Sequence, residues 1–214
     1  MRLVFASNNA HKLSEMRAIM PAGVDIVSLR DIGFEQEIEE TGTTLEENSM
    51  IKARTVWEFI RHQPSTASSQ IDGIFADDTG LEIDALDGAP GVYTARWYLM
   101  DKGAKEAKTD LENFAANRAK ALRELAGKDN RQCQFRTVIT LIWNQEPGCR
   151  TQQVEGVVRG QIATEEYGEG GFGYDPVFIP EGYDKTFGEL SAEIKNTISH
   201  RARALAELVK VLNR

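Results

Sequence analysis

The sequence predicts an α/β fold in which a sheet joins two lobes, and three observations lead to that prediction. Strand-like residues at 2–6 and 24–27 flank a helical pattern at 13–20, which makes a β-α-β unit and favours a parallel sheet. The strongest strand pattern, at 134–143, is followed by a turn and a second strand at 151–160. The chain of 214 residues can form one large domain or two small lobes with a buried core.

Capping boxes predict two further helices in the chain. The box at 43–47 opens a helix that continues to about residue 62, and the box at 109–112 opens one that continues to about residue 126. The segment 63–72 has the composition of a loop. Apolar residues at helical spacing after 199–201 predict a final amphipathic helix.

Composition argues against several classes of function. A formal net charge of −8 disfavours nonspecific binding to nucleic acid or to anionic membranes, which needs a basic surface. No apolar run approaches the ~20 residues of a membrane-spanning helix. Cys133 and Cys149 form no metal-binding motif and no signal peptide is evident, so free thiols and a cytoplasmic location are expected.

The stretch 73–96 is the strongest candidate for a functional site. Strand-prone residues at 73–76 lead into Asp77-Asp78-Thr79-Gly80, which we interpret as the end of a strand. Five carboxylates fall between Asp77 and Asp87. Like charges ~4 Å apart repel by roughly 1 kcal/mol in water and ~4 kcal/mol near a protein surface, so a divalent cation would offset them. A solvated turn is the alternative interpretation.

Three other segments suit an anionic ligand. Residues 7–12 lie at or just before a helix N-terminus, where free N–H groups and the dipole favour an anion and Lys12 adds positive charge; a simple N-cap is the alternative. Lys52 could reach a phosphate or pair with a neighbouring helical side chain, Glu47 or Asn48. The cations His200-Arg201 begin a helix against the dipole preference, which suggests a bound anion or a base-edge acceptor.

A glycine-rich loop at 168–176 also suits a ligand. Four glycines in six residues let the backbone approach a flat or anionic molecule closely, and Phe172 offers a face for stacking. A flexible linker is the alternative, although linkers do not normally contain Phe, Tyr and Pro.

Seven short motifs occur in one order and together resemble a known family. They are Ser7-x-Asn9-x-x-Lys12, Glu39-Glu40-Thr41-Gly42, Glu47-Asn48 with Lys52-Ala53-Arg54, Ala76-Asp77-Asp78-Thr79-Gly80-Leu81, Gly88-Ala89-Pro90-Gly91-Val92-Tyr93-Thr94-Ala95-Arg96, Gly171-Phe172-Gly173-Tyr174-Asp175-Pro176 and Ser199-His200-Arg201. This set resembles the inosine triphosphate pyrophosphatase family, which hydrolyses non-standard purine nucleoside triphosphates. The resemblance spans residues 7–201, and 63–72 and 97–110 carry no matching motif.

The resemblance implies a fold, an activity and partners. The fold is α/β and two-lobed, around a long mixed β-sheet with flanking helices and an active-site cleft between the lobes, with 1–214 as a single domain. The activity is Mg²⁺-dependent cleavage of ITP, dITP or XTP to the monophosphate and pyrophosphate, which cleanses the nucleotide pool. The partners are a purine nucleoside triphosphate and a second copy of the chain in a homodimer.

The resemblance also implies roles for individual residues. Asp78 is similar to the catalytic carboxylate and a metal ligand, and Glu40 to a second metal ligand, while Asp77 fits a supporting position. The implied triphosphate-binding residues are Ser7, Asn8, Asn9, Ala10, His11, Lys12, Lys52 and Thr79. The implied nucleoside-binding residues are Phe172, Gly173, Tyr174, Asp175, Lys195, His200 and Arg201.

Physical chemistry agrees with these implied roles. Mg²⁺ takes oxygen ligands, usually one or two carboxylates with waters and phosphates, which suits Glu40 and Asp78. We expect Asp78 to orient or deprotonate a water that attacks the α-phosphorus, while lysines stabilise the departing pyrophosphate. His200 and Arg201 are donors that suit a 6-oxo purine and disfavour the 6-amino group of adenine. No residue of the sequence explains how GTP would be rejected.

Two alternative functions remain open at this stage. The first is a pyrophosphatase for ordinary or methylated nucleoside triphosphates, or for pyrimidines, that uses the same phosphate-binding residues. The second is a nucleotide-binding module that does not turn over its ligand.

Overall fold

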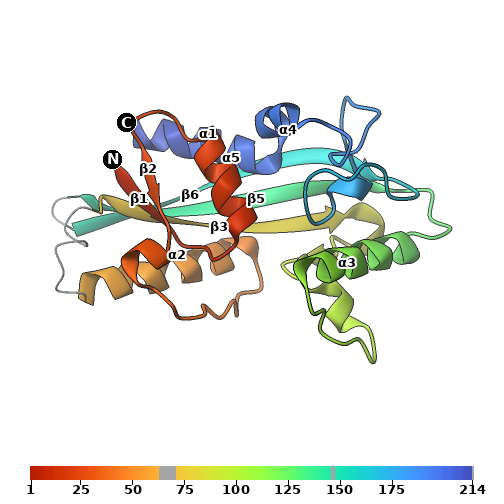
Figure 1. Cartoon of the computed structure of the whole chain (residues 1–214), viewed down its shortest axis with the longest axis horizontal. Coiled ribbons are helices and arrows are strands. Elements are labelled where there is room, and N and C mark those ends of the chain that lie inside the picture. Colours follow the sequence, from red (N-terminus) through yellow and green to blue (C-terminus); the bar gives the residue numbers. More distant parts are fainter. Residues whose placement is uncertain (63–70, 146–147, 214) are drawn as a thin grey trace. The chain divides into compact units, whose positions relative to one another are not determined.

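The computed structural model describes residues 1–62, 71–145 and 148–213, and within them it shows an α/β fold (Figure 1). The strands are β1 (Arg2–Phe5), β2 (Asp25–Val27), β3 (Gly73–Ile83), β4 (Pro90–Gly91), β5 (Gln132–Gln145), β6 (Gly148–Ile162) and β7 (Phe178–Pro180). The α-helices are α1 (Ala10–Ile19), α2 (Leu45–His62), α3 (Asp110–Glu124), α4 (Ala192–Ile198) and α5 (His200–Leu212), with 3-10 turns η1 (Arg30–Ile32), η3 (Asp84–Leu86), η4 (Trp97–Met100) and η5 (Asp175–Val177).

The described strands form one mixed sheet with flanking helices, as expected. Their order is β2-β1-β3-β5-β6-β7, with β4 paired to β3. Strand β1 is parallel to both β2 and β3, whereas β4 is antiparallel to β3 and β7 is antiparallel to β6. The parallel pairs confirm the predicted β-α-β unit at the N-terminus. Strands β5 and β6 confirm the two strands predicted after residue 130, and residues 146–147 of the predicted turn lie outside the described residues.

The described chain divides into two compact units. Unit 1 comprises Met1–Asp78, Thr137–Gly156 and Arg201–Arg214, and unit 2 comprises Thr79–Arg136 and Val157–His200. Strands β3, β5 and β6 contribute residues to both units.

Unit 1 has a hydrophobic cluster on each face of its part of the sheet. Successive residues of a strand point to opposite faces, so Leu3 and Phe5 of β1 enter one cluster while Val4 enters the other. Helices α1 and α5 pack on the face that carries Phe5, and α2 packs on the face that carries Val4 (Figure 1). On β3 the same alternation places Phe75 on the α1 and α5 side and Ala76 on the α2 side.

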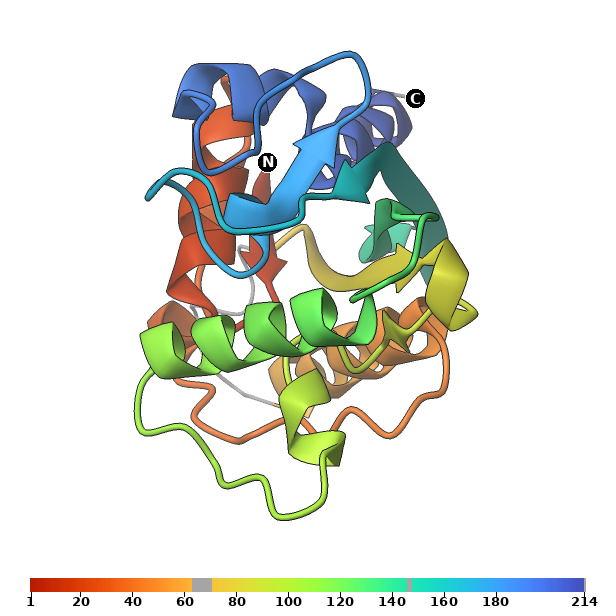
Figure 2. The same cartoon turned by 90° about the vertical axis from the view of Figure 1, so that its right-hand side faces the viewer.

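Unit 2 has a core of its own. Ala121 and Leu125, on α3 and directly after it, pack with Phe135 of β5, Val158 of β6 and Phe178 of β7. Figure 2 views α3 from outside this unit. Thr109 caps helix α3 as predicted, because its side chain accepts a hydrogen bond from the backbone N–H of Glu112, while the Glu112 carboxylate accepts from the backbone N–H of Lys108. It ends at Glu124, two residues before the predicted end, and helix α4 was not predicted from the sequence.

The prediction that Asp77 and Asp78 end a strand is wrong. Strand β3 runs through them without a break, from Gly73 to Ile83. Local turn propensity predicted the break, but both aspartates are buried and paired with cations, so tertiary contacts hold the backbone extended. The neighbouring strand does end here, because β1 pairs with β3 only as far as Phe5 and Phe75.

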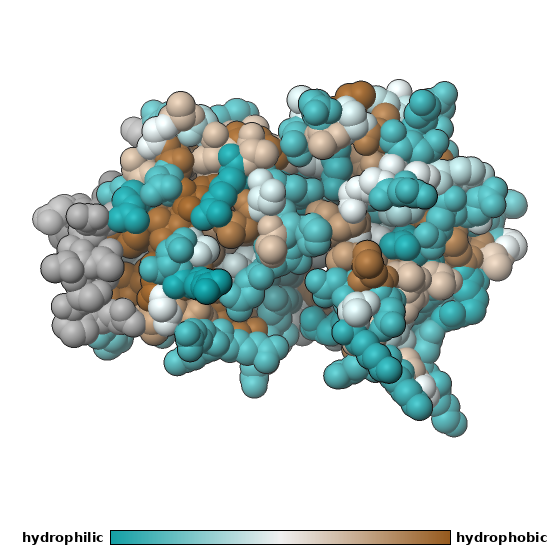
Figure 3. Space-filling view, in the orientation of Figure 1, coloured by the Kyte–Doolittle hydropathy of each residue, from teal (hydrophilic) through white to brown (hydrophobic). Residues whose placement is uncertain are grey.

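Other expectations concern the surface and the cysteines. Among the described residues, no helix has both the length and the apolar character to cross a bilayer. Hydrophilic residues are spread over the face drawn in Figure 3. Cys133 is buried and Cys149 exposed, and both are free thiols as predicted. Most of the predicted 63–72 loop, residues 63–70, lies outside the described residues.

Candidate active site

The two aspartates of β3 lie just beyond the carboxyl end of its parallel neighbour, β1. Ligands of open α/β sheets bind in the crevice outside the carboxyl ends of the strands. After Phe5 the chain leaves the sheet and enters α1 through residues 6–9. The end of β1 therefore brings the N-terminus of α1 close to Asp77, to which Lys12 of α1 is hydrogen-bonded.

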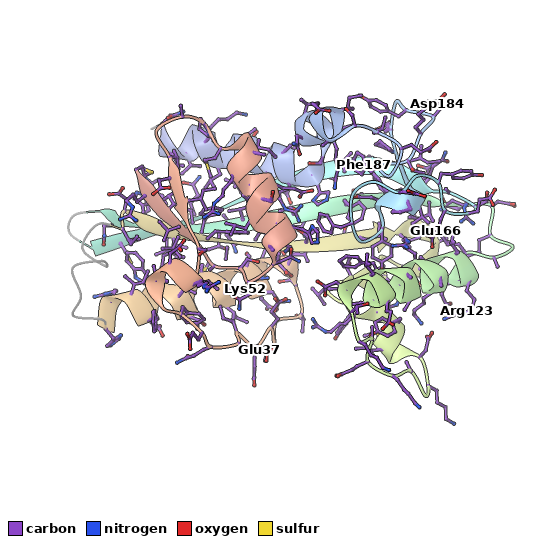
Figure 4. All side chains as sticks on the ribbon, viewed as in Figure 1. Glu37, Lys52, Arg123, Glu166, Asp184 and Phe187 are labelled. Atoms are coloured by element: carbon purple, nitrogen blue, oxygen red, sulfur yellow. The ribbon has the colours of Figure 1, made fainter. Side chains whose placement is uncertain are left out.

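One set of charges in unit 1 centres on Lys52. Its Nζ contacts Asp78 Oδ1 at 2.8 Å and Glu40 Oε1 at 3.1 Å. The side chains of Lys52 and Asp78 are only 8% and 9% exposed, and that of Glu40 is 30% exposed. Lysine 52 projects from α2 (Figure 4), and its ammonium bridges the two carboxylates that the sequence implied as metal ligands.

Neither helical neighbour predicted as an alternative partner of Lys52 contacts it. Glu47 accepts hydrogen bonds from the backbone N–H groups of Thr43 and Thr44, which completes the predicted capping box of α2. Asn48 accepts one from the backbone N–H of Gly42. Because both side chains turn back to the helix N-terminus, Lys52 is left to pair with Glu40 and Asp78.

A second set of charges in unit 1 centres on Asp77, whose side chain is completely buried. Lys12 Nζ lies 3.0 Å from Asp77 and Arg201 Nε lies 3.5 Å from it, and Arg201 also pairs with Glu15. Lys12 and Glu15 lie three residues apart on α1, which places them on one face of that helix. Arg201 lies in the first turn of α5, so Asp77 joins the beginnings of two helices.

The alternation of β3 explains why adjacent aspartates have different partners. Side chains at successive strand positions point to opposite faces, so Asp77 follows Phe75 to the α1 and α5 side, and Asp78 follows Ala76 to the α2 side. Arg201 is one of the two cations that begin a helix against the dipole preference. In this structure its partners are protein carboxylates.

The pKa values of Asp77 and Asp78 are shifted in opposite directions. Burial alone would raise the pKa of Asp77, but Lys12, Arg201 and Lys52 together hold that pKa well below its usual range. Burial, assisted by Glu40, raises the pKa of Asp78 in spite of the opposing charges of Lys52 and Lys12. Asp77 is thus the more permanent anion, and Asp78 the carboxylate that more readily takes up a proton.

The pKa values of Lys12 and Lys52 are also shifted. Burial lowers the pKa of Lys12, with Lys52 and Arg201 adding to this effect and Asp77 opposing it. Burial would lower the pKa of Lys52 too, but Asp78, Glu40 and Asp77 outweigh it and raise the value. Lys52 is therefore held as a cation by the carboxylates around it.

Asp78 Oδ2 of the Lys52 set is buried and has no hydrogen-bond partner among the described residues. The same holds for Nδ2 of Asn48, which lies four residues before Lys52 on α2. An unpartnered carboxylate oxygen beside a second carboxylate, Glu40, suits Mg²⁺, which binds one or two carboxylates and completes its shell with water and phosphate. Within the described ranges no group of three or more His, Cys, Asp or Glu side chains is placed to hold a metal ion, so a metal here would need such outside ligands.

The predicted phosphate segment 7–12 begins α1. Asn9 accepts a hydrogen bond from the backbone N–H of Lys12, so it is an N-cap, as the alternative interpretation proposed. Ser7 is half-buried and accepts from the backbone N–H of Asn9, while residues 8–11 are exposed. Lys12, at the end of this segment, reaches Asp77 of β3.

The predicted nucleoside-binding loop in unit 2 is organised around Asp175. Its Oδ2 accepts hydrogen bonds from the backbone N–H of Phe172 and from Lys195 Nζ, both at 2.7 Å. Lys195 Nζ also lies 4.7 Å from the centre of the Phe172 ring. Gly171 has a positive φ of 73°, and a Cβ there would collide with the Asp175 carboxylate, so this tight turn requires glycine.

Tyr174 and His200, two further predicted residues of unit 2, make contacts within that unit. Tyr174 donates from its hydroxyl to the backbone carbonyl of Thr94, which lies in the motif at 88–96. His200 stacks on Phe135, with ring centres 4.9 Å apart. Thr79 lies half-buried in β3, immediately after Asp78.

The sequence missed several residues that support these sets. In unit 2, Arg118 of α3 donates to the Gly173 carbonyl at 2.9 Å and pairs with Glu166. In unit 1, Glu15 holds Arg201. Asn48 was predicted as a possible partner of Lys52, but its contact with Gly42 was not predicted. The i, i+3 spacing of Lys12 and Glu15 was a usable signal for one of them, whereas nothing local to Arg118 indicates its contact with Gly173.

The low pKa of Asp77 predicts a contribution to stability that is lost at acid pH. Because its folded value lies below the unfolded value of about 3.9, the contribution is present above that pH and is lost as pH falls toward the folded value. We expect the thermal midpoint of the wild type to drop on acidification below about pH 4 more steeply than that of Asp77→Asn. Thermal unfolding from pH 7 to pH 3 measures both slopes, and equal slopes would contradict the assignment.

The chain is similar to known proteins over almost its whole length. A model of the Ham1 family matches residues 3–211. A dITP/XTP pyrophosphatase of Flavobacterium johnsoniae is 42% identical over 212 residues, covering 99% of this chain and 98% of that protein. One of Bacillus subtilis is 44% identical over 212 residues, covering 98% and 96%.

Solved structures are similar over the whole length of the chain. The Ham1 protein of Staphylococcus aureus superposes with a TM-score of 0.77 at 36% identity, and a HAM1 protein of Coxiella burnetii with a TM-score of 0.78 at 35% identity. Each comparison covers 100% of this chain and 98% of the other.

Proposed function

The chain belongs to the Ham1 family, and from that premise we propose that it hydrolyses ITP, dITP and XTP to the corresponding monophosphate and pyrophosphate. The observation that carries the proposal is the Lys52 set of unit 1. A buried carboxylate with an unpartnered oxygen, Asp78, lies beside a second carboxylate and a lysine, which is the combination that phosphoryl chemistry requires.

In the proposed reaction Asp78 acts on the attacking water. Its Oδ2 accepts a hydrogen bond from the water and takes its proton as the oxygen attacks the α-phosphorus in line with the leaving pyrophosphate. Burial raises the pKa of Asp78, which makes the carboxylate a better proton acceptor than an exposed one. The bond to the α-phosphorus forms from the water oxygen, and the bond to the bridging oxygen of the pyrophosphate breaks.

The lysines of unit 1 bind the departing pyrophosphate. Lys52 and Lys12 are held close to β3 by Asp78 and Asp77, so their positions are set before substrate arrives. Mg²⁺, held by Glu40 and Asp78, would neutralise phosphate charge when bound. These cations are needed locally because a protein of net charge −8 repels a triphosphate at long range.

Unit 2 supplies recognition of the purine in this proposal. Phe172 offers a ring for stacking, and Asp175 and Lys195 fix that ring in place. A donor from His200 suits a 6-oxo acceptor, whereas the 6-amino group of adenine would face another donor. Arg201 belongs to unit 1, where Glu15 and Asp77 are its partners.

A panel of nucleotides tests the function. We expect kcat/KM for ITP and XTP to exceed that for ATP by about ten- to a hundredfold, because an unpaired buried polar group costs about 1–3 kcal/mol. Pyrophosphate and monophosphate are measured as products, with Mg²⁺ and with EDTA. Equal values for ITP and ATP would favour a pyrophosphatase of ordinary nucleotides, and tight binding without pyrophosphate release would favour a non-catalytic module.

Membership of the family supports three further proposals. The chain forms a homodimer, its residues 1–214 act as one catalytic domain, and it works on the cytoplasmic nucleotide pool. Light scattering of the purified chain tests the first, with a molar mass twice the 23.8 kDa of one chain as the expected result.

A further inference from the structure

Asn48 of α2 is a buried polar residue that the proposed reaction does not use. Its side chain is completely buried. Its Oδ1 accepts a hydrogen bond from the backbone N–H of Gly42 at 2.8 Å, and this bond fixes which end of the amide is oxygen. The Nδ2 group is then a buried donor, and no described atom accepts from it.

An unmet buried donor requires an explanation. Leaving one in place weakens folding by about ten- to a hundredfold in the equilibrium constant, so native proteins supply such groups with a partner from the chain, an ordered water or a ligand. Asn48 has no such partner in the described chain.

The position of Asn48 points to the ligand of the Lys52 set. Asn48 and Lys52 are four residues apart on α2, and residues at that spacing are neighbours on one helix face. Lys52 contacts Glu40, and Asn48 holds Gly42, two residues after Glu40. Asp78 Oδ2, a buried acceptor without a hydrogen-bond partner in the described chain, belongs to the Lys52 set. A buried donor and a buried acceptor without partners thus accompany the same lysine.

We propose that Asn48 is a further substrate-binding residue, whose Nδ2 donates a hydrogen bond to a phosphate oxygen of the triphosphate. This assignment rests on the proposed function, because it takes the phosphate chain to be the ligand of the Lys52 set. An uncharged donor suits this position, since it binds an anionic oxygen without competing with Lys52 for Glu40 and Asp78.

Asn48 has a second, structural role that the test must separate from the first. A Cβ at Gly42 would lie 2.6 Å from Glu47 Cβ and 2.7 Å from Asn48 Oδ1, so the segment that carries Glu40 packs tightly on the start of α2. Truncation to alanine would release this segment and remove the donor together. An informative variant has to keep the acceptor and remove only the donor.

Asn48→Asp meets that requirement, because a carboxylate oxygen still accepts from Gly42 while no N–H remains. Asn48→Leu removes the donor and the acceptor without adding charge. Glu47→Gln, the adjacent position in the same helical turn, is the matched control, since its amide oxygen can still accept from Thr43 and Thr44. Thermal unfolding of each variant confirms that it is folded before binding is measured.

The measurement is the dissociation constant for pyrophosphate by calorimetry in EDTA, followed by KM and kcat for ITP with Mg²⁺. We expect Asn48→Asp and Asn48→Leu each to weaken pyrophosphate binding by about tenfold or more and to raise KM more than they lower kcat, while Glu47→Gln stays within about twofold of the wild type. This common loss would identify the donor, the one feature that both variants lack.

Three results would overturn the inference. If only Asn48→Leu weakened pyrophosphate binding, holding Gly42 would be the whole role of the residue. If only Asn48→Asp weakened it, the cause would be charge repulsion. A change confined to the Mg²⁺ concentration needed for activity would assign the donor to a metal-bound water instead. A wild type that binds pyrophosphate but does not release it from ITP would refute the proposed reaction, and the binding comparison would still decide the role of Asn48.

Discussion

Asp78→Asn is expected to lose most turnover while it keeps the fold. The amide oxygen of asparagine can still accept from Lys52, so the buried contact at 2.8 Å has a replacement, but the side chain can no longer take a proton from water. General-base catalysis contributes about 10²- to 10⁴-fold, so kcat for ITP should fall within that range. The thermal midpoint should fall less than that of Lys52→Met, because Lys52 keeps Glu40 as a charged partner.

The measurement is steady-state release of pyrophosphate at saturating Mg²⁺ and saturating ITP. Asp87→Asn is the matched control, since Asp87 belongs to the same acidic stretch but lies exposed in the turn that follows η3. Its φ of 52° is one that asparagine tolerates, so this variant should retain kcat within about twofold. A folded, metal-saturated Asp78→Asn with nearly normal kcat would remove Asp78 from the chemistry.

We expect Lys52→Met to lower the free energy of unfolding more than the other proposed variants do. Removing its ammonium leaves the Asp78 and Glu40 carboxylates without the cation that bridges them, and one of the two is buried. Breaking a buried pair by removing one partner lowers the free energy of unfolding by about 3–5 kcal/mol. Added Mg²⁺ should raise the unfolding midpoint of this variant more than that of the wild type, because a metal ion can take over part of the neutralisation.

Denaturant unfolding at pH 7, with and without Mg²⁺, measures both effects. Lys210→Met is the matched control, because Lys210 pairs with Glu207 on the exposed surface of α5, where the side chains are 63% and 47% exposed. Exposed pairs contribute about 0–1 kcal/mol, so the control should change little. If Lys52→Met were as mild as Lys210→Met, the bridging role of Lys52 would be refuted.

The comparison of prediction with structure shows where local information suffices. The capping boxes at Thr44 and Thr109 correctly predicted the starts of α2 and α3, because a cap is decided by residues three or four positions apart. The end of β3 was predicted wrongly, because turn propensity at Asp77-Asp78 is overridden by cations that come from α1, α2 and α5.

For the candidate site, too, the sequence indicated the residues but not the contacts between them. Asp78, Lys12 and Lys52 were recognisable as candidates from residue type and context, and all three belong to the two charge sets of unit 1. The sequence did not reveal that Lys12 and Lys52 belong to different sets. Nor did it reveal Glu15 as the partner of Arg201, which lies 186 positions away in the chain.

By itself the sequence determined the N-terminal β-α-β unit, the starts of α2 and α3, the order of the motifs and the family, since periodicity, caps and motif order are properties of neighbouring residues. Only the tertiary structure decided which aspartate faces which lysine, and that Asn48 and Asp78 keep a buried atom without a partner. The reason is that strand alternation sends adjacent side chains to opposite faces, and the partners on each face arrive from distant parts of the chain.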